Sequence, residues 1–345
     1  MITTLRQRIQ SGRRRFAGAA LYWTGVGFVY RALTHSTGAV ILMYHSVADD
    51  AAAEFIDPAN RMSPTEFARQ MAFLARHRRV VSLSELMAQL VSGRSPPQGT
   101  VCITFDDGYL DNLTMAAPIL KSLDLPATLF LPTKYIDRAQ TQWVDVLHCL
   151  FRYRRLQRIV VESLNLDADL RVASEEWRVR RVLHLRLLES DFATRQGLLE
   201  DICGQLEPEF EAPRLTMSWD DVRSLQHLHP SFDVGGHTRH HVDLRAHGGD
   251  IARDEIQGCR QDIERALGRA PRYFSFPYGR WNEESRAMVQ QANWQAAIGA
   301  NRNTLITSQA DRFVLGRPET PHTMTALRFQ TSGAYPGALS LLGLH

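Results

Sequence analysis

Short apolar runs and amphipathic stretches alternate along most of the chain. Residues 40–45, VILMYH, have the length and β-branched content of a buried strand that ends in a histidine. Ser63, Pro64 and Glu66 then form a typical helix start, with a capping hydroxyl, a first-turn proline and an acid three residues after the cap. Apolar residues continue at helical spacing over 67–74, so a helix follows the first strand.

The same alternation continues toward the carboxyl end, with one interruption. The pattern predicts further strands at residues 80–81, 101–105, 127–131, 232–234, 274–276, 296–298 and 313–315, and further helices at 83–90, 110–123, 219–228, 250–267 and 282–291. Strands that alternate with helices favour a parallel sheet. The expected fold class is therefore α/β.

The interruption lies between about residues 138 and 215 and is rich in arginine and leucine. Its apolar residues recur at helical spacing, as at Leu183, Leu187, Leu198, Ile202 and Leu206. We interpret it as a helical insertion that emerges from a loop at the carboxyl ends of the strands. It would form a lid or a wall of the substrate cleft, or else a scaffold pair of helices.

The amino-terminal segment differs in composition from the rest. Residues 1–38 carry six arginines and no acid, and residues 16–30 are an uncharged run of 15, which is short for a membrane span. We expect a basic helix that lies at a membrane interface or packs on the domain, with an export signal or anchor as the alternative. Residues 39–325 would form one domain, followed by a loosely structured tail over 326–345. The expected location is cytoplasmic or inner-membrane-associated, with export not excluded.

Composition is ordinary for a globular protein. The 345 residues are 44% apolar and 22% charged, with a net charge of +3. Outside residues 1–38 there are 34 basic and 37 acidic residues, a net of −3, so nucleic acid is not an expected partner. The four cysteines are far apart and indicate neither a metal motif nor a disulfide framework.

The first candidate for chemistry is residues 101–109, VCITFDDGY. An apolar strand ends in Asp106 and Asp107, and the following glycine favours a turn. In parallel α/β folds the carboxyl ends of the strands face the active site. Consecutive strand residues point in opposite directions, so the two carboxylates can have different roles. On its own, the motif is more typical of a strand that ends in a solvated acidic turn.

The second candidate is residues 235–241, GGHTRHH, which follow another strand. His237 and His241 are four residues apart, so one helical turn would place both imidazoles on the same face. Together with Asp107 they would supply three ligands and leave a position for water, the arrangement of a catalytic zinc site. His240 would point away from this set.

The third motif is residues 274–279, FSFPYG. The three motifs occur here in the order found in the polysaccharide deacetylase family, also described as NodB homology or carbohydrate esterase family 4. The chain resembles the Phe-Pro-Tyr-Gly branch of that family over about residues 38 to 320. The resemblance implies a distorted (β/α)7 barrel that removes N-acetyl groups from an N-acetylhexosamine-containing glycan or glycan precursor.

The resemblance also implies roles for the motif residues. Asp107, His237 and His241 would bind a divalent transition metal, with zinc favoured by this ligand set. Asp106 would act as the base, and a backbone N–H near Tyr278 would stabilise the oxyanion.

The general acid has two candidates. Many members place a histidine in a late motif, where this chain has His322. Other members carry it in the first strand through a circular permutation, and His45 at the end of residues 40–45 resembles that form. We favour His45.

Two positions depart from the usual family pattern. Ser275 stands where many members have an arginine that holds the base, and no Asp-Trp pair follows Trp294. Arg317 or Arg280 would have to replace that arginine.

Trp143 and Asp145 resemble a Trp–Asp signature of members that carry an insertion. Exposed aromatic residues would provide stacking platforms for a sugar, and the candidates are Tyr109, Trp143, Tyr278 and Trp281. These aromatics favour an N-acetylated glycan over the alternative of a non-sugar cyclic amide.

A non-catalytic glycan-binding or membrane-docked protein is the other alternative, and the complete set of catalytic residue types argues against it. If residues 1–38 form an interfacial helix, we also expect the protein to contact a membrane surface through them.

Overall fold

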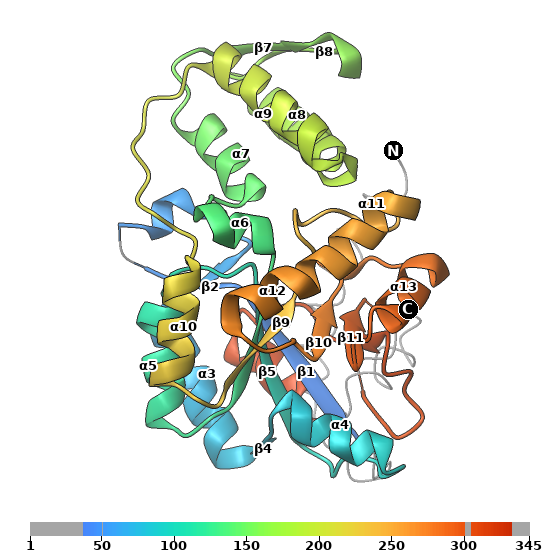
Figure 1. Cartoon of the computed structure of the whole chain (residues 1–345). Coiled ribbons are helices and arrows are strands. Elements are labelled where there is room, and N and C mark those ends of the chain that lie inside the picture. Colours follow the sequence, from blue (N-terminus) through green and yellow to red (C-terminus); the bar gives the residue numbers. More distant parts are fainter. Residues whose placement is uncertain (1–36, 50, 301–304, 333–345) are drawn as a thin grey trace, which may run out of the picture.

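A computed structural model of the chain describes residues 37–49, 51–300 and 305–332. Within these residues a nearly closed barrel of seven parallel strands forms the centre of the molecule (Figure 1). In sheet order the strands are β1 (Ala39–Tyr44), β5 (Thr100–Asp106), β6 (Ala127–Leu131), β9 (Phe232–Gly236), β10 (Tyr273–Ser275), β11 (Ala296–Gly299) and β12 (Leu315–Gly316). An antiparallel bridge from Ala39 to Ile306 joins β1 to the segment before β12. The predicted distorted (β/α)7 barrel is confirmed.

Helices surround this barrel. They are α3 (Pro64–His77), α4 (Leu83–Val91), α5 (Ala117–Ser122), α6 (Thr133–Arg138), α10 (Trp219–Leu228), α11 (Gly249–Arg253), α12 (Cys259–Leu267), α13 (Glu283–Gln291) and α14 (Met324–Gln330). The π-helical turns Asn112–Ala116 and Asp254–Gly258 lead into α5 and α12. The predicted helix start is present, because the Ser63 hydroxyl accepts a hydrogen bond from the Glu66 N–H.

Successive residues of β1 face opposite sides of the barrel wall, as the pleat of a strand requires. Tyr44 packs outward against Phe67 of α3, with ring centroids 5.3 Å apart. Ile41 faces inward and joins Cys102 and Leu86 of α4 in a second buried cluster. Helix α4 therefore closes the amino end of the barrel, and the carboxyl end stays available for side chains with chemical roles.

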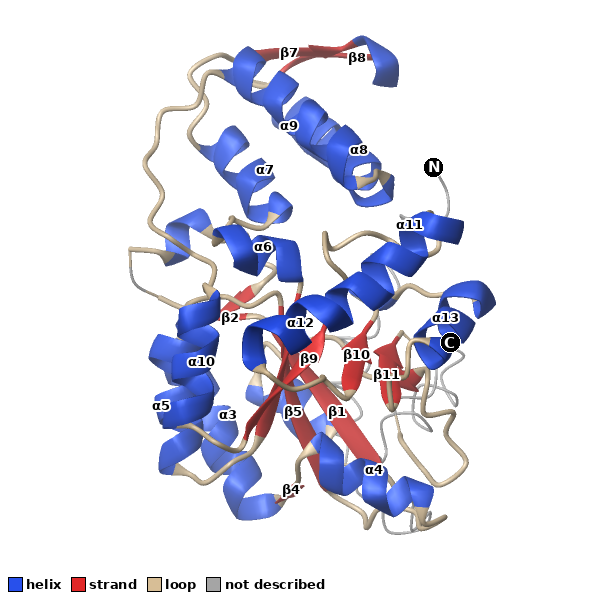
Figure 2. Ribbon diagram, in the orientation of Figure 1, coloured by secondary structure: helices blue, strands red, loops and turns tan. Residues whose placement is uncertain are grey.

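The predicted helical insertion is present and also contains two strands. It contains α7 (Trp143–Arg152), α8 (Ala173–Glu189) and α9 (Phe192–Leu206), together with an antiparallel pair, β7 (Arg158–Val161) and β8 (Leu166–Asp169). The sequence analysis missed this hairpin, whose turn uses Asn165 in the left-handed conformation. The insertion has its own buried core and lies above the carboxyl ends of the barrel strands (Figures 1 and 2).

The expected loose tail from residue 326 is wrong for its first part. Helix α14 continues to Gln330 and buries Leu327 and Phe329. Residues 333–345 lie outside the described residues, as do residues 1–36 with the proposed basic helix. The described helices include none with the length and apolarity to cross a bilayer. All four cysteines are free, as expected.

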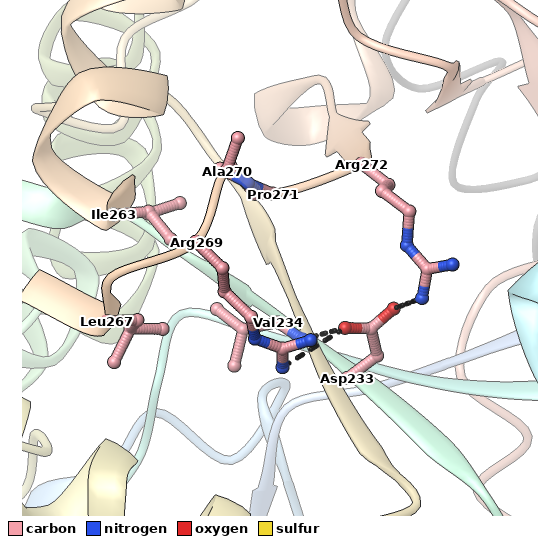
Figure 3. Close-up of a pocket in the computed structure, with 8 residues that line it drawn as sticks. All are labelled: Asp233, Val234, Ile263, Leu267, Arg269, Ala270, Pro271 and Arg272. Atoms are coloured by element: carbon pink, nitrogen blue, oxygen red, sulfur yellow. Dashed lines mark hydrogen bonds and ion pairs between the residues drawn. The ribbon is translucent and has the colours of Figure 1, made fainter. Parts of the chain in front are cut away.

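Two further strand pairings complete the fold. β4 (Arg79–Val80) pairs with the first residues of β5, and β2 (Ser46–Val47) pairs with β3 (Arg61–Met62). A small pocket at the amino end of β9 is lined in part by Asp233, which pairs with Arg272 at 2.8 Å and with Arg269 at 3.6 Å (Figure 3). This pocket lies at the opposite end of β9 from the histidine motif.

Candidate metal centre

Two buried carboxylates stand at the end of β5. Asp106 is its last residue, and Asp107 and Gly108 follow with left-handed φ angles of 73° and 69°. A Cβ at Gly108 would lie 2.7 Å from a side-chain carbon of Ile136, so only glycine fits this turn without displacement. Both carboxylates lie near the histidine motif, since Asp106 Oδ2 and Asp107 Oδ1 are each 3.7 Å from His237 Nε2. Because Asp107 lies beyond the end of the strand, the expected alternation of strand residues does not set its direction.

The histidine pair is close, but not because of a helical turn. Residues 237–241 form a loop in which Thr238 and His241 have φ angles of 64° and 53°. The helical explanation is therefore wrong, although both imidazoles do converge. Their Nε2 atoms are 3.2 Å apart. Gly236 permits close packing of β9, since a Cβ there would lie 2.5 Å from the Trp294 ring.

Asp107 completes a compact set of three ligand atoms. Its Oδ1 lies 3.2 Å from His241 Nε2 and 3.7 Å from His237 Nε2. Two ligands ~2.0–2.1 Å from a metal and separated by the tetrahedral angle would lie about 3.3 Å apart. The spacing of this group therefore fits a tetrahedral metal site.

The hydrogen bonds around the imidazoles leave their Nε2 lone pairs directed at one another. His237 Nδ1 lies 2.7 Å from the Ser275 carbonyl, which can only accept, so Nδ1 carries the proton. The Tyr278 hydroxyl accepts from Trp143 Nε1 at 2.8 Å and donates to the His241 carbonyl at 3.2 Å. Its remaining lone pair accepts from His241 Nδ1 at 3.0 Å.

This arrangement places acceptors together without a donor. The buried Asp107 Oδ1 has no hydrogen-bond partner. Buried acceptors are costly unless a donor or a cation satisfies them. Burial also lowers the pKa of His237 to about 4, so this imidazole is neutral near neutral pH and can bind a metal. These three residues fit a divalent metal ion.

Burial alone would raise the pKa of Asp107, but the neighbouring imidazoles of His241, His45 and His237 lower it below the usual range. Asp107 is therefore ionised at neutral pH, the state in which a carboxylate binds metal.

Asp106 is held by Arg317. The guanidinium donates Nη1–H to Asp106 Oδ1 at 3.0 Å, and its Nη2 contacts the other carboxylate oxygen. The same Nη2 donates to the Ser275 hydroxyl at 2.9 Å. Arg317 thus provides the guanidinium that the Phe-Pro-Tyr-Gly motif lacks at Ser275. Arg280, the other candidate, pairs with Asp243 at 2.8 Å instead.

The two candidate acids have different surroundings. His45 follows β1 on its inward-facing side, and its backbone carbonyl accepts from Asn112 Nδ2 at 2.7 Å. His45 is close enough to both carboxylates to lower the pKa of each, and its buried Nδ1 has no hydrogen-bond partner. His322 lies before α14, where the adjacent Pro321 carbonyl accepts from Gln70 of α3. The structure thus places His45 beside the carboxylates.

The insertion forms a layer behind the motif residues. Gln142 donates to the Asp107 carbonyl at 3.0 Å, and Tyr109 donates its hydroxyl to Asp145 at 2.8 Å. Tyr109 and Trp143 are each 1% exposed, so the expectation that they stack on a sugar is wrong. Tyr278 is half-buried, as is the fourth candidate, Trp281.

Sequence reasoning missed Gln142 and Arg195, the latter a fully buried arginine of α9. Arg195 lies in helical register with Leu199, Ile202 and Leu206, which are also buried. The sequence signal that could have identified Arg195 was an arginine in the apolar stripe of a predicted helix. Gln142 immediately precedes the Trp–Asp signature but has no distinctive pattern of its own.

Comparisons with known proteins agree with this geometry. The profile of the family described as polysaccharide deacetylase matches residues 93–168 and 210–297, which include Asp106, Asp107 and both histidines. YxkH of Bacillus subtilis (strain 168), whose name assigns it to the polysaccharide deacetylases, is 34% identical over 97 residues. That match covers 28% of this chain and 32% of YxkH, so it spans about a third of that protein.

Two solved structures share the fold. The Streptococcus pyogenes deacetylase PplD, in complex with acetate, superposes with a TM-score of 0.56 at 15% identity, over 84% of this chain and 96% of PplD. IcaB from Ammonifex degensii superposes with a TM-score of 0.54 at 18% identity, over 87% of this chain and 97% of IcaB. The two solved structures show that this chain shares their fold, and the profile match with the three motifs at the strand ends likens the chain to the polysaccharide deacetylase family.

Proposed function

We propose that the protein is a metal-dependent deacetylase that removes N-acetyl groups from an N-acetylhexosamine-containing glycan or glycan precursor. The observation that carries this proposal is the buried group of Asp107, His237 and His241 beside a second carboxylate, Asp106. Three ligands with a separate, ionised carboxylate next to them are what amide hydrolysis by an activated water needs.

A divalent metal bound to these ligands would supply an activated water and polarise the amide carbonyl, and zinc suits the two imidazoles and one carboxylate. Asp106 accepts the proton of the attacking water. Burial would raise the pKa of Asp106, but Arg317, His237 and His45 lower it below its usual range, so it is ionised and ready to accept.

The departing amine needs a proton, because an amide anion is a poor leaving group. His45 supplies it, and its place beside both carboxylates supports this role over His322. The backbone N–H of Tyr278 is the proposed donor to the developing oxyanion. Tyr278 has a φ of 58°, and its side chain is fixed by Trp143 and His241, so its peptide is held in one orientation.

Acetate, the ligand in the PplD structure, is the product that this reaction would release. Half-buried Tyr278 and Trp281 offer aromatic surface for a sugar ring near the proposed oxyanion donor. Both observations support an acetylated sugar as substrate.

The test is to incubate the full-length protein with N-acetylglucosamine oligosaccharides and O-acetylated sugars, measuring acetate release, and with a cyclic amide, measuring ring opening. We expect acetate from the N-acetylated glycans, loss of activity with a chelator and recovery with zinc. Asp106→Asn is the matched inactive control. Hydrolysis of the cyclic amide alone, or glycan binding without any acetate release, would refute the proposed function.

A further inference from the structure

Arg195 is a buried arginine behind the loop that carries the histidines. It is 0% exposed, and its N–H groups donate to backbone carbonyls of two segments. Nε and Nη2 donate to Leu187 and Ser190, at 3.0 and 3.3 Å, in the turn between α8 and α9. Nη1 donates to the carbonyls of His240 and His241, at 3.0 and 3.1 Å. One guanidinium thus joins the insertion to the proposed metal ligand loop.

The charge of Arg195 is not balanced by an adjacent acid. Within the described part of the chain it forms no ion pair with an aspartate or glutamate. Its guanidinium lies 5.3 Å from the centre of the Trp143 ring, a cation–π distance, and next to the Tyr135 hydroxyl. Burying an unpaired cation is costly, so a purely structural role would be served better by an apolar residue on this apolar face of α9.

His241 is the residue that needs this support. Its φ of 53° is in the left-handed region, which is unfavourable for a residue with a Cβ. Such conformations persist when the surroundings determine them strongly. The His241 carbonyl accepts from both Arg195 Nη1, at 3.1 Å, and the Tyr278 hydroxyl, at 3.2 Å. These two bonds fix the peptide, and the peptide fixes the direction of the imidazole.

We propose that Arg195 is a positioning residue of the metal site, which holds the His240–His241 backbone so that His241 Nε2 faces Asp107 and His237. This inference rests on the metal ligation in the proposed function. Arg195 lies in residues 169–209, which the family profile does not match, so the insertion of this chain completes the site from outside the matched barrel.

The test is Co²⁺ titration of the metal-free, full-length protein, followed by visible absorption, with zinc affinity measured by competition. We expect Arg195→Met and Arg195→Lys to bind zinc roughly 10–100-fold more weakly, the usual effect of removing an outer partner of a ligand. Their Co²⁺ spectra should also differ from that of the wild type, because the ligand geometry changes. Lysine keeps the charge but cannot reproduce the forked contacts to both segments.

Leu199→Ala is the matched control, since Leu199 is buried on the same face of α9, in the insertion core. It should lower the melting temperature while zinc affinity stays within about threefold. Wild-type zinc affinity and Co²⁺ spectra in the Arg195 variants would overturn the inference. An equally large loss of zinc affinity in Leu199→Ala would overturn it too. If Arg195→Met does not fold, Arg195→Lys decides. A wild type that binds no metal would instead refute the proposed function.

Discussion

Arg317 binds the carboxylate of Asp106 through both terminal nitrogens, across 211 residues of sequence. Both side chains are buried, with 5% and 3% exposure, so their interaction is weakly screened by solvent. The arginine also bonds to Thr104 and Ser275, from β5 and β10. This network fixes the proposed base in its ionised form.

Replacing Arg317 with methionine should leave Asp106 as a buried, unpaired charge. We expect the free energy of unfolding to fall by about 3–5 kcal/mol near neutral pH, as measured by urea unfolding. Since Arg317 lowers the pKa of Asp106, the acid limb of the deacetylation profile should move to higher pH. The stability that the lowered pKa confers is present above the unfolded-state pKa, near ~3.9, and is lost as pH falls through the folded-state value.

Arg286→Met is the matched control, because Arg286 pairs with Asp311 in a partly exposed position. This substitution should lower the free energy of unfolding by less than about 1 kcal/mol and leave the pH profile of deacetylation unchanged. Equal effects of the two substitutions would contradict the role given to Arg317.

Metal analysis distinguishes the proposed metal ligands from their neighbours. The purified protein should contain about one divalent transition metal ion per chain, and Asp107→Ala or His241→Ala should lose it. His240→Gln should retain it, since His240 Nδ1 contacts Glu255 at 2.7 Å instead. Full metal content in both ligand variants would show that the metal lies elsewhere.

That Asp107 and the two histidines lie close together could be predicted from sequence, because strand ends meet at one edge of a parallel barrel. Asp107 follows one strand, and His237 follows another, so the pattern sufficed to bring them together. The path from His237 to His241 could not be predicted. It depends on the left-handed backbone conformation of Thr238 and His241, and nothing local in the sequence favours that conformation over a helical turn.

Contacts with the insertion were the least predictable part of the site. Tyr109 and Trp143 looked like sugar platforms, but burial depends on tertiary packing that local pattern does not contain. Arg317 could be named as a candidate only because an arginine was missing at Ser275. Arg317 reaches Asp106, and Arg280 does not, because the barrel closes with β12 next to β1, the neighbour of β5. Spacing in the sequence does not specify this closure.

The general acid is tested by comparing His45→Ala with His322→Ala. His45→Ala should reduce the rate with ordinary acetamides and remove the alkaline limb of the pH profile, because an acid must be protonated to act. Acetamides with a better leaving amine should lose less rate. Loss of activity in His322→Ala with an intact His45→Ala enzyme would reverse the assignment.

Asp145 should make stability depend on pH. Burial raises the pKa of this residue to about 8, whereas an unfolded aspartate titrates near ~3.9. Between these values the folded state keeps a proton that the unfolded state has lost. The free energy of unfolding should therefore fall as pH rises, by up to ~1.4 kcal/mol per pH unit, and Asp145→Asn should remove that contribution.

Urea unfolding over a pH series checks this prediction. The quantity to compare is the free energy of unfolding of the wild type and of the variant at each pH. Asp220→Asn is the control, because the Asp220 side chain is 89% exposed and should leave the slope intact. A slope that survives in Asp145→Asn would show that other groups cause it.

In the proposed mechanism, a metal on Asp107, His237 and His241 works with Asp106 as base to release acetate. The most direct measurement is the rate of acetate release per bound zinc from an N-acetylated oligosaccharide, for wild type and Asp106→Asn, as zinc is added to metal-free protein. Wild-type activity should rise to a plateau at about one zinc per chain, and Asp106→Asn should bind the same zinc while releasing acetate roughly 10²–10⁴-fold more slowly. Full activity without metal, or an unchanged rate in Asp106→Asn, would contradict the account.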